Sequence, residues 1–492
     1  MTYHSITPHR LVAGLFIIFL CMALMVVAQR RSWKPTLAVT LGFALVVRVA
    51  FLFLTWKTQP YDLANDFWSA GNATLHHHDP ILDNQRLQGW ASLPTYTFVL
   101  AGAAWTVIHL HWSWLIAARI PALVSDIGVV YVVGRLVTAS GGSRDTAALR
   151  RFQYACSPIA IIISSEHGQL EPFCLLFAFT AFVVVLNGGP GISARRAVAG
   201  GVILAIAVSG QTWPILFGPA LLAGLPTWRR RIQATAGGAA LWVLIFVTMP
   251  LTVGTPVGKL PFLFKHMTSN QPTIGTWGWA GVWVTQHPTA LPVWQDPLWV
   301  HVAKYGSKLA LLGVLVAVIL WRKGHPLDMA TASVTALIVI TPAFGNQYLQ
   351  WPAPSSIARP TRLTLAVQIA IGLYATMFYL PMQMMTYPLW QDTDNAMMFA
   401  SLGLAVLMII ALPWRRRIWD RSAPSEDESD AGPEPETTVS DRASDRATQN
   451  LSEPTRPKTA TDTTRPGGMD GTGRGPVTDD TLPPRAPTPP TS

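Results

Sequence analysis

Residues 35–56 read PTLAVTLGFALVVRVAFLFLTW, and this stretch decides the fold. It carries one charge, Arg48, and as a helix it is long enough to cross the roughly 30 Å of hydrocarbon in a bilayer. Similar apolar runs recur along residues 1–413, and only 13% of all 492 residues are charged. The sequence therefore predicts an all-α polytopic membrane protein with about 11–13 transmembrane helices.

The net charge of +10 is distributed unevenly along the chain. Residues 1–413 hold 25 Lys and Arg against 12 Asp and Glu, which gives +13, and the remainder holds 11 against 14, which gives −3. Most of the basic excess lies in short clusters between apolar runs, at residues 30–31, 195–196, 229–231, 322–323 and 415–417. This is the positive-inside pattern of a membrane protein, so we expect membrane lipid and no nucleic acid as a partner.

Placing the basic clusters in the cytoplasm puts two long polar loops, residues 57–92 and 254–307, outside. The segment between the first loop and Arg150 needs an odd number of crossings, yet it contains two apolar runs. Either one of these runs is re-entrant, or residues 144–151 lie outside. Residues 414–492 are rich in Pro, Thr, Ser, Asp and Arg, so we expect a disordered cytoplasmic tail after the transmembrane domain 1–413.

Carboxylates are rare in residues 1–413, and four of the twelve lie in the first polar loop, at Asp62, Asp66, Asp79 and Asp83. Because acids are excluded from hydrocarbon, this loop indicates where water-exposed chemistry can occur. The spacing of four would place Asp62 and Asp66 on one face if the loop begins as a helix. The alternative is that these are solvated loop acids beside the membrane.

Four short motifs follow one another within residues 45–390. They are Asp62-Leu63 with Asp79-Pro80 seventeen residues later, Arg119-Ile120-Pro121 with Asp126, His167-Gly168-Gln169, and Gln347-Tyr348-Leu349-Gln350-Trp351. In pattern and order they resemble the motifs of the multispanning GT-C glycosyltransferases, which take sugars from polyprenyl-phosphate donors. The resemblance implies a GT-C-like fold without a nucleotide-binding loop or cofactor.

The resemblance also implies an inverting transfer of a sugar, mannose by family frequency, to a lipid-linked or envelope glycan acceptor. Asp62 matches the first-loop aspartate and is the implied general base, with Asp66 as the alternative. The implied substrate-binding residues lie in the other polar segments: Arg119, Asp126, Glu166, His167, Gln169, Lys259, Lys265, His266, Gln347 and Tyr348. Since the Gln347 amide carries no charge, stabilising the leaving phosphate would require Arg119 or one of the basic loop residues.

Several alternatives remain open at this level. Arg119 and Asp126 are seven residues apart, about 10 Å along a helix, and could serve structural neutralisation instead of binding. We expect no metal site, because the consecutive residues His76–His78 point to alternate sides of an extended segment. The composition favours the plasma membrane of an actinobacterium, with the active site facing outside. A lipid transporter or flippase is the main alternative function, although no related halves are visible, and a scaffold that presents its tail is another.

Overall fold

The computed structural model describes residues 6–82, 93–268, 277–287, 295–342, 345–385 and 387–416, and these residues form helices and no β-strand. This confirms the predicted all-α polytopic membrane fold. Six segments are long and apolar enough to cross a membrane: α1 (Pro8–Arg30), α2 (Leu37–Thr55), α5 with α6 (Trp114–Ala139), α12 (Trp228–Thr252), α15 (Pro297–Trp321) and Thr393–Arg416. Apart from its first residues, the predicted tail lies outside the described residues.

Five shorter apolar segments of 10–17 residues accompany these spans in the described part of the chain: α4 (Thr95–Leu110), α9 (Glu171–Leu186), η4 with α11 (Trp213–Ala223), α16 (Pro326–Ile340) and α18 (Thr364–Tyr379). The other α-helices are α3 (Trp68–Leu75), α7 (Arg144–Ala155), α8 (Pro158–Ile162), α10 (Ala194–Gly210), α13 (Leu260–Thr268), α14 (Gly278–Gln286), α17 (Ala353–Ala358) and α19 (Tyr387–Ile410). Within the two combined spans, α5 is Trp114–Ala117, α6 is Arg119–Ala139, η4 is Trp213–Phe217 and α11 is Gly218–Ala223. Short π or 3₁₀ turns complete the described structure: η1 (Asp62–Phe67), η3 (Ile163–His167), η5 (Val257–Lys259), η6 (Asn346–Gln350), η7 (Pro381–Met384) and η8 (Trp414–Arg416).

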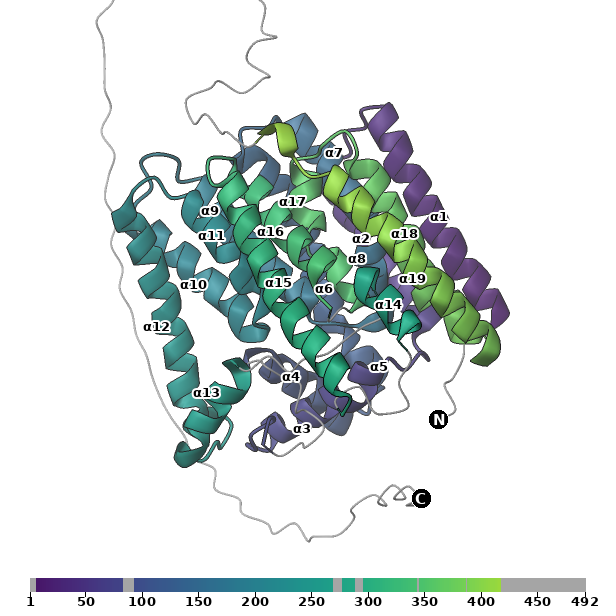
Figure 1. The fold of residues 1–492 in the computed structure, drawn as a ribbon, viewed down its shortest axis with the longest axis horizontal. Helices are drawn as coiled ribbons and strands as arrows, with labels where there is room; N and C mark the ends of the chain where they lie inside the picture. Colours follow the sequence, from purple (N-terminus) through teal and green to yellow (C-terminus); the bar gives the residue numbers. More distant parts are fainter. Residues whose placement is uncertain are drawn as a thin grey trace, which may run out of the picture. The chain divides into compact units, whose positions relative to one another are not determined.

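Small residues allow helices in this bundle to approach closely. α10 packs between α9 and α12 (Figure 1). A Cβ atom added at Gly201 of α10 would lie 1.8 Å from the Ala234 carbonyl oxygen of α12. One at Gly238 of α12 would lie 2.8 Å from the Gly201 carbonyl oxygen. The two backbones are therefore in direct contact, as is usual where transmembrane helices pack through glycine.

The bundle has two chemically different ends. At one end Lys34 pairs with Asp145, Arg150 donates to Gln29, and Arg359 pairs with Asp328. We call this the basic end. α2 leaves it and carries the chain to the opposite end, where η1 places Asp62. We call this the Asp62 end.

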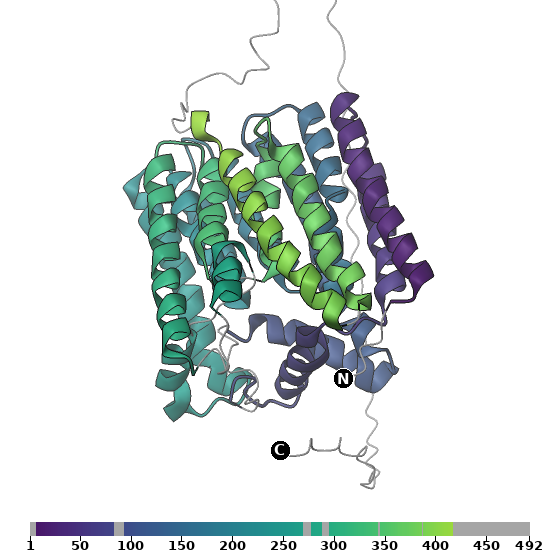
Figure 2. The ribbon, with the colours of Figure 1, turned by 45° about the vertical axis from the view of Figure 1, so that its right-hand side comes forward.

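Packing shows which of the two apolar runs before Arg150 crosses between the ends of the bundle. Helix α4 packs against α3 and α5 at the Asp62 end, below the main bundle in Figures 1 and 2. The run that forms α4 therefore does not cross to the basic end. α6 alone carries the chain between the two ends, and α7 lies at the basic end with Arg150 beside Gln29.

Candidate active site

Asp62 is the first residue of the π-helical turn η1, which is the next helical element after α2 and is separated from it by residues 56–61. The Trp114 indole Nε1 donates a hydrogen bond of 2.7 Å to the Leu63 carbonyl, and the Trp114 ring packs edge-on against Trp68. The Leu63 side chain is fully buried. Helix α5 therefore holds η1 in place, and with it the half-buried Asp62 side chain.

The turn after η3 reaches Asp62 from 107 residues away. The Gln169 amide donates 2.7 Å to Asp62 Oδ2, and its nitrogen also lies 3.0 Å from His167 Nε2. The structure thus brings together three of the residues predicted from the first and third motifs. A neutral amide that donates to one carboxylate oxygen fixes the orientation of that carboxylate.

Gly168 is required where this turn packs against its neighbours. Its φ is +70°, a conformation that favours glycine. A Cβ atom there would lie 2.6 Å from Arg119 Cγ and 3.3 Å from Leu63 Cδ1. The turn is therefore pressed between α6 and η1, and a side chain at this position would require one of them to move.

Arg119, predicted to bind substrate, is saturated by the protein. Its Nε donates to the Glu166 carbonyl at 2.7 Å. Nη1 donates to the Trp56 and Leu115 carbonyls, and Nη2 donates to the carbonyl and hydroxyl oxygens of Thr58. A guanidinium has five N–H donors, and these bonds use all five. Arg119 therefore clamps the segment after α2 onto the Glu166 turn and has no donor left for a phosphate.

Two buried acids, Glu166 and Glu171, flank the turn that carries Gln169. Glu166 and Glu171 are fully buried, and within the described residues neither carboxyl group has a hydrogen-bond partner. The Thr58 hydroxyl is near Glu166 but donates to the Thr55 carbonyl instead. Burying an acid without partners is costly, so both carboxyl groups are disfavoured in their charged form.

The turn η3 lies outside the candidate membrane spans. The pKa values of its two titratable groups, Glu166 and His167, are shifted in opposite directions. Burial raises the pKa of Glu166 from 4.5 to about 7, although the Arg119 charge opposes the shift. Burial lowers the pKa of His167 from 6.5 to about 4, against the Asp62 charge and with the help of Arg119. The Nδ1 atom of His167 is buried and has no partner among the residues that the structure describes. The imidazole is therefore neutral at neutral pH.

Two tyrosines complete what we call the Asp62 cluster, which otherwise consists of Asp62, Glu166, His167, Gln169 and Glu171. Burial, together with the charges of Glu171 and Asp62, raises the pKa of Tyr348. The Tyr379 ring lies 5.1 Å from the His167 ring, centroid to centroid. Tyr348 belongs to the predicted set; Tyr379 and Glu171 do not. An acid at the start of an apolar run could have indicated Glu171, but Tyr379 lies inside such a run without any signal.

Asp126, a predicted substrate-binding residue, lies in a separate buried network and does not join the Asp62 cluster. Arg48 Nε donates 2.6 Å to Asp126 Oδ2, while Tyr154 donates 2.8 Å to Oδ1. Gln350 also donates to Oδ1, at 3.2 Å. Because both oxygens are occupied in a fully buried site, Asp126 serves the structural neutralisation that was the alternative interpretation.

The remaining predicted residues occupy other places. Asp66 lies half-buried in the same turn as Asp62, and Gln347 folds over Gly345. Lys259 and Lys265 are exposed on η5 and α13, beside an apolar cluster that is separate from the main core. The side chain of His266 lies outside the described residues.

Asp79, the acid of the second half of the first motif, has a structural environment. Its Oδ1 accepts from the backbone N–H groups of Ile81 and Leu82, and its other oxygen accepts from the Thr255 hydroxyl. Gly254, at φ +67°, approaches the His77 carbonyl so closely that a Cβ would lie 2.3 Å from it. Asp79 therefore fastens the first loop to the segment that follows α12.

In the ranges that the structure describes, no group of three or more His, Cys, Asp and Glu side chains could hold a metal ion. The described groups at the Asp62 end are an oriented carboxylate, two buried carboxyl groups and a neutral imidazole. No family model and no curated protein matches the chain.

Proposed function

We propose that this protein is an inverting glycosyltransferase with a GT-C-like fold. It would move a sugar, with mannose the first to test, from a polyprenyl-phosphate donor to a lipid-linked or envelope glycan acceptor. The reaction would take place at the outer face of an actinobacterial plasma membrane. The observation that carries the proposal is the Asp62 carboxylate, oriented by Gln169 at the end of a bundle of membrane-spanning helices.

Asp62 would act as the general base. Gln169 occupies Oδ2, and within the described residues Oδ1 has no hydrogen bond, so this oxygen can take a proton from the acceptor hydroxyl. The acceptor oxygen forms a bond to the anomeric carbon, and the bond from that carbon to the phosphate oxygen breaks. The phosphate leaves with the electron pair, and the single displacement inverts the anomeric configuration.

The leaving phosphate requires positive charge that Arg119 does not supply. His9, Arg10 and Lys57 line a cavity of about 170 Å³ at the same end of the bundle. Thr58 also lines this cavity, and it is the residue whose carbonyl and hydroxyl accept from Arg119. Arg10 and Lys57 are thus the cations that we assign to the phosphate, in place of the predicted Arg119.

The test follows sugar transfer by the full-length protein in nanodiscs, with a panel of polyprenyl-phosphate sugars and a native lipid extract. Asp62→Asn should reduce the turnover about 10²–10⁴-fold, because general-base catalysis contributes that much. Its thermal unfolding midpoint should stay close to the wild-type value. Asp145→Asn, which removes an exposed acid at the basic end, is the matched control and should retain transfer.

Other outcomes distinguish the alternatives. If Asp62→Asn retains transfer and Asp66→Asn loses it, the base is Asp66. Truncation after Arg417 should leave an enzyme active, whereas it would abolish the function of a tail-presenting scaffold. Lipid movement between leaflets without transfer from any donor would replace the proposal with a flippase.

A further inference from the structure

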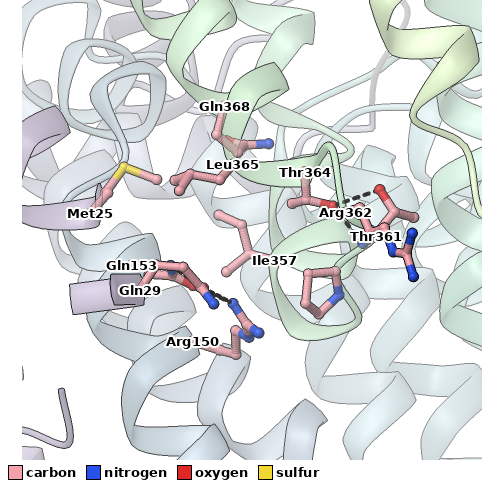
Figure 3. A pocket seen from close by; sticks show the side chains of 11 residues that line it. Met25, Gln29, Arg150, Gln153, Ile357, Thr361, Arg362, Thr364, Leu365 and Gln368 are labelled. Carbon is pink, nitrogen blue, oxygen red and sulfur yellow. Dashed lines mark hydrogen bonds between the residues drawn. The ribbon is translucent and has the colours of Figure 1, made fainter. Parts of the chain in front are cut away.

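A cavity of about 350 Å³ lies at the basic end of the bundle, which is opposite to the end that holds the Asp62 cluster. Residues of α1, α7, α17 and α18 line it, together with the connection between the last two. Figure 3 shows Arg150 and Arg362 on either side of Ile357. Its volume is within the range of small-molecule sites in proteins.

The cavity is positively charged. Two arginines line it, and no lining residue is acidic. Arg150 Nη1 donates to the side-chain oxygens of Gln29 and Gln153, each at 2.7 Å, so neutral amides hold the guanidinium in position. The buried Nε of Arg150 has no partner within the described residues. Arg362 is exposed, and it forms no ion pair with any other residue that the structure describes.

A buried amide adds a second kind of recognition. Gln368 is 1% exposed, and its Oε1 has no partner among the described residues. Its Nε2 is 3.4 Å from the Ser356 hydroxyl. A buried carbonyl oxygen without a donor is costly, so a ligand that brings a hydroxyl group would relieve it. The cavity thus combines donors for an anion with an acceptor for a hydroxyl.

The surroundings are those of a lipid interface. Met25 and Leu365 give the cavity apolar walls, while Val27 and Leu363 nearby expose 45% and 37% of their surface. A second cavity, of about 540 Å³, shares Arg362 with the first and extends to Arg415. Basic pockets between transmembrane helices at the positively charged side are typical sites for anionic lipid headgroups.

We infer that the cavity between Arg150, Arg362 and Gln368 binds the headgroup of an anionic phospholipid that carries hydroxyl groups, such as phosphatidylglycerol. The guanidinium groups would contact the phosphate, and Gln368 Oε1 would accept from a headgroup hydroxyl. This site is independent of the proposed glycosyl transfer, since none of its residues belongs to the Asp62 cluster.

The first test measures lipid binding to the delipidated full-length protein by native mass spectrometry. Arg150→Gln/Arg362→Gln should weaken phosphatidylglycerol binding about tenfold or more, because two charge-assisted contacts are lost. The matched control Arg229→Gln/Arg322→Gln removes two exposed arginines of other basic clusters and should change binding less than about twofold. Equal losses in both double variants would mean unspecific attraction to basic surface and would overturn the site.

A second test keeps the proposal falsifiable if the double arginine variant fails to fold. Wild type should prefer phosphatidylglycerol to phosphatidylmethanol, which has the same charge and no headgroup hydroxyl. Gln368→Leu, a neutral change, should remove this preference. Competition with inorganic phosphate distinguishes the source of the anion: displacement of the lipid at equal concentration would overturn the lipid assignment. A wild-type protein without preference would overturn the role of Gln368.

Discussion

The Arg48–Asp126 pair in the core and the Asp62 cluster at the end of the bundle are both acidic places among apolar helices. In the core, Arg48, Tyr154 and Gln350 satisfy both oxygens of Asp126. In the cluster, the carboxyl groups of Glu166 and Glu171 have no partner within the described residues. Native proteins satisfy most buried polar groups, so the unpartnered carboxyl groups support our proposal of a site at the Asp62 cluster. In the core, Arg48 Nη2 and Gln350 Oε1 also have no partner within the described residues, but both Asp126 oxygens are satisfied.

The largest effect should come from breaking the core pair. Asp126→Leu leaves the Arg48 charge fully buried and unpaired, and removing one partner of such a pair destabilises a protein by about 3–5 kcal/mol. We expect a lower unfolding midpoint in detergent and poor recovery of folded protein.

The double variant Arg48→Met/Asp126→Leu is the control for this prediction. It removes both charges, and replacing a buried pair with apolar side chains is often neutral. It should therefore be more stable than either single variant. If the double variant were the least stable, the pair would contribute net stability beyond neutralisation.

A smaller effect should appear in the pH dependence of stability. The pKa of Glu166 is raised from 4.5 to about 7, so the folded state binds more protons than the unfolded state between these values. Stability from this group is therefore lost as the pH rises from about 4.5 to 7, by about 3 kcal/mol. Relative to wild type, Glu166→Gln should gain stability over this range, as measured by unfolding at a series of pH values.

His167 provides the opposite control from the same turn. Its pKa is lowered from 6.5 to about 4, so the unfolded state binds more protons between these values. Stability from His167 is lost as the pH falls through this range. Relative to wild type, His167→Gln should gain stability toward acid. Both variants shifting in the same direction would contradict the assigned environments.

Apolar runs in the sequence predicted the helices. The order of the short motifs predicted that Asp62 lies close to His167 and Gln169. The sequence did not predict the role of Arg119, because its partners are mostly backbone carbonyls, which carry no side-chain signature. Gln350 was likewise invisible as a partner of Asp126, 224 residues away. Whether the run at α4 crosses depended on its packing against α3, which composition does not report.

The smallest predicted effect compares two glycines in turns. Gly168→Ala places a Cβ atom 2.6 Å from Arg119 Cγ at φ +70°, whereas Gly189 has φ +54° and no atom within 4 Å of its added Cβ. The backbone term, about 1–2 kcal/mol, should therefore be shared by both variants. Only Gly168→Ala must also displace the turn that carries Gln169. The two variants should therefore have similar unfolding midpoints, but only Gly168→Ala should lose glycosyl transfer. Equal transfer by the two variants would mean that the bond between Gln169 and Asp62 does not orient the base. Loss confined to Gly168→Ala would connect the glycine, the amide and the carboxylate as one unit of the site.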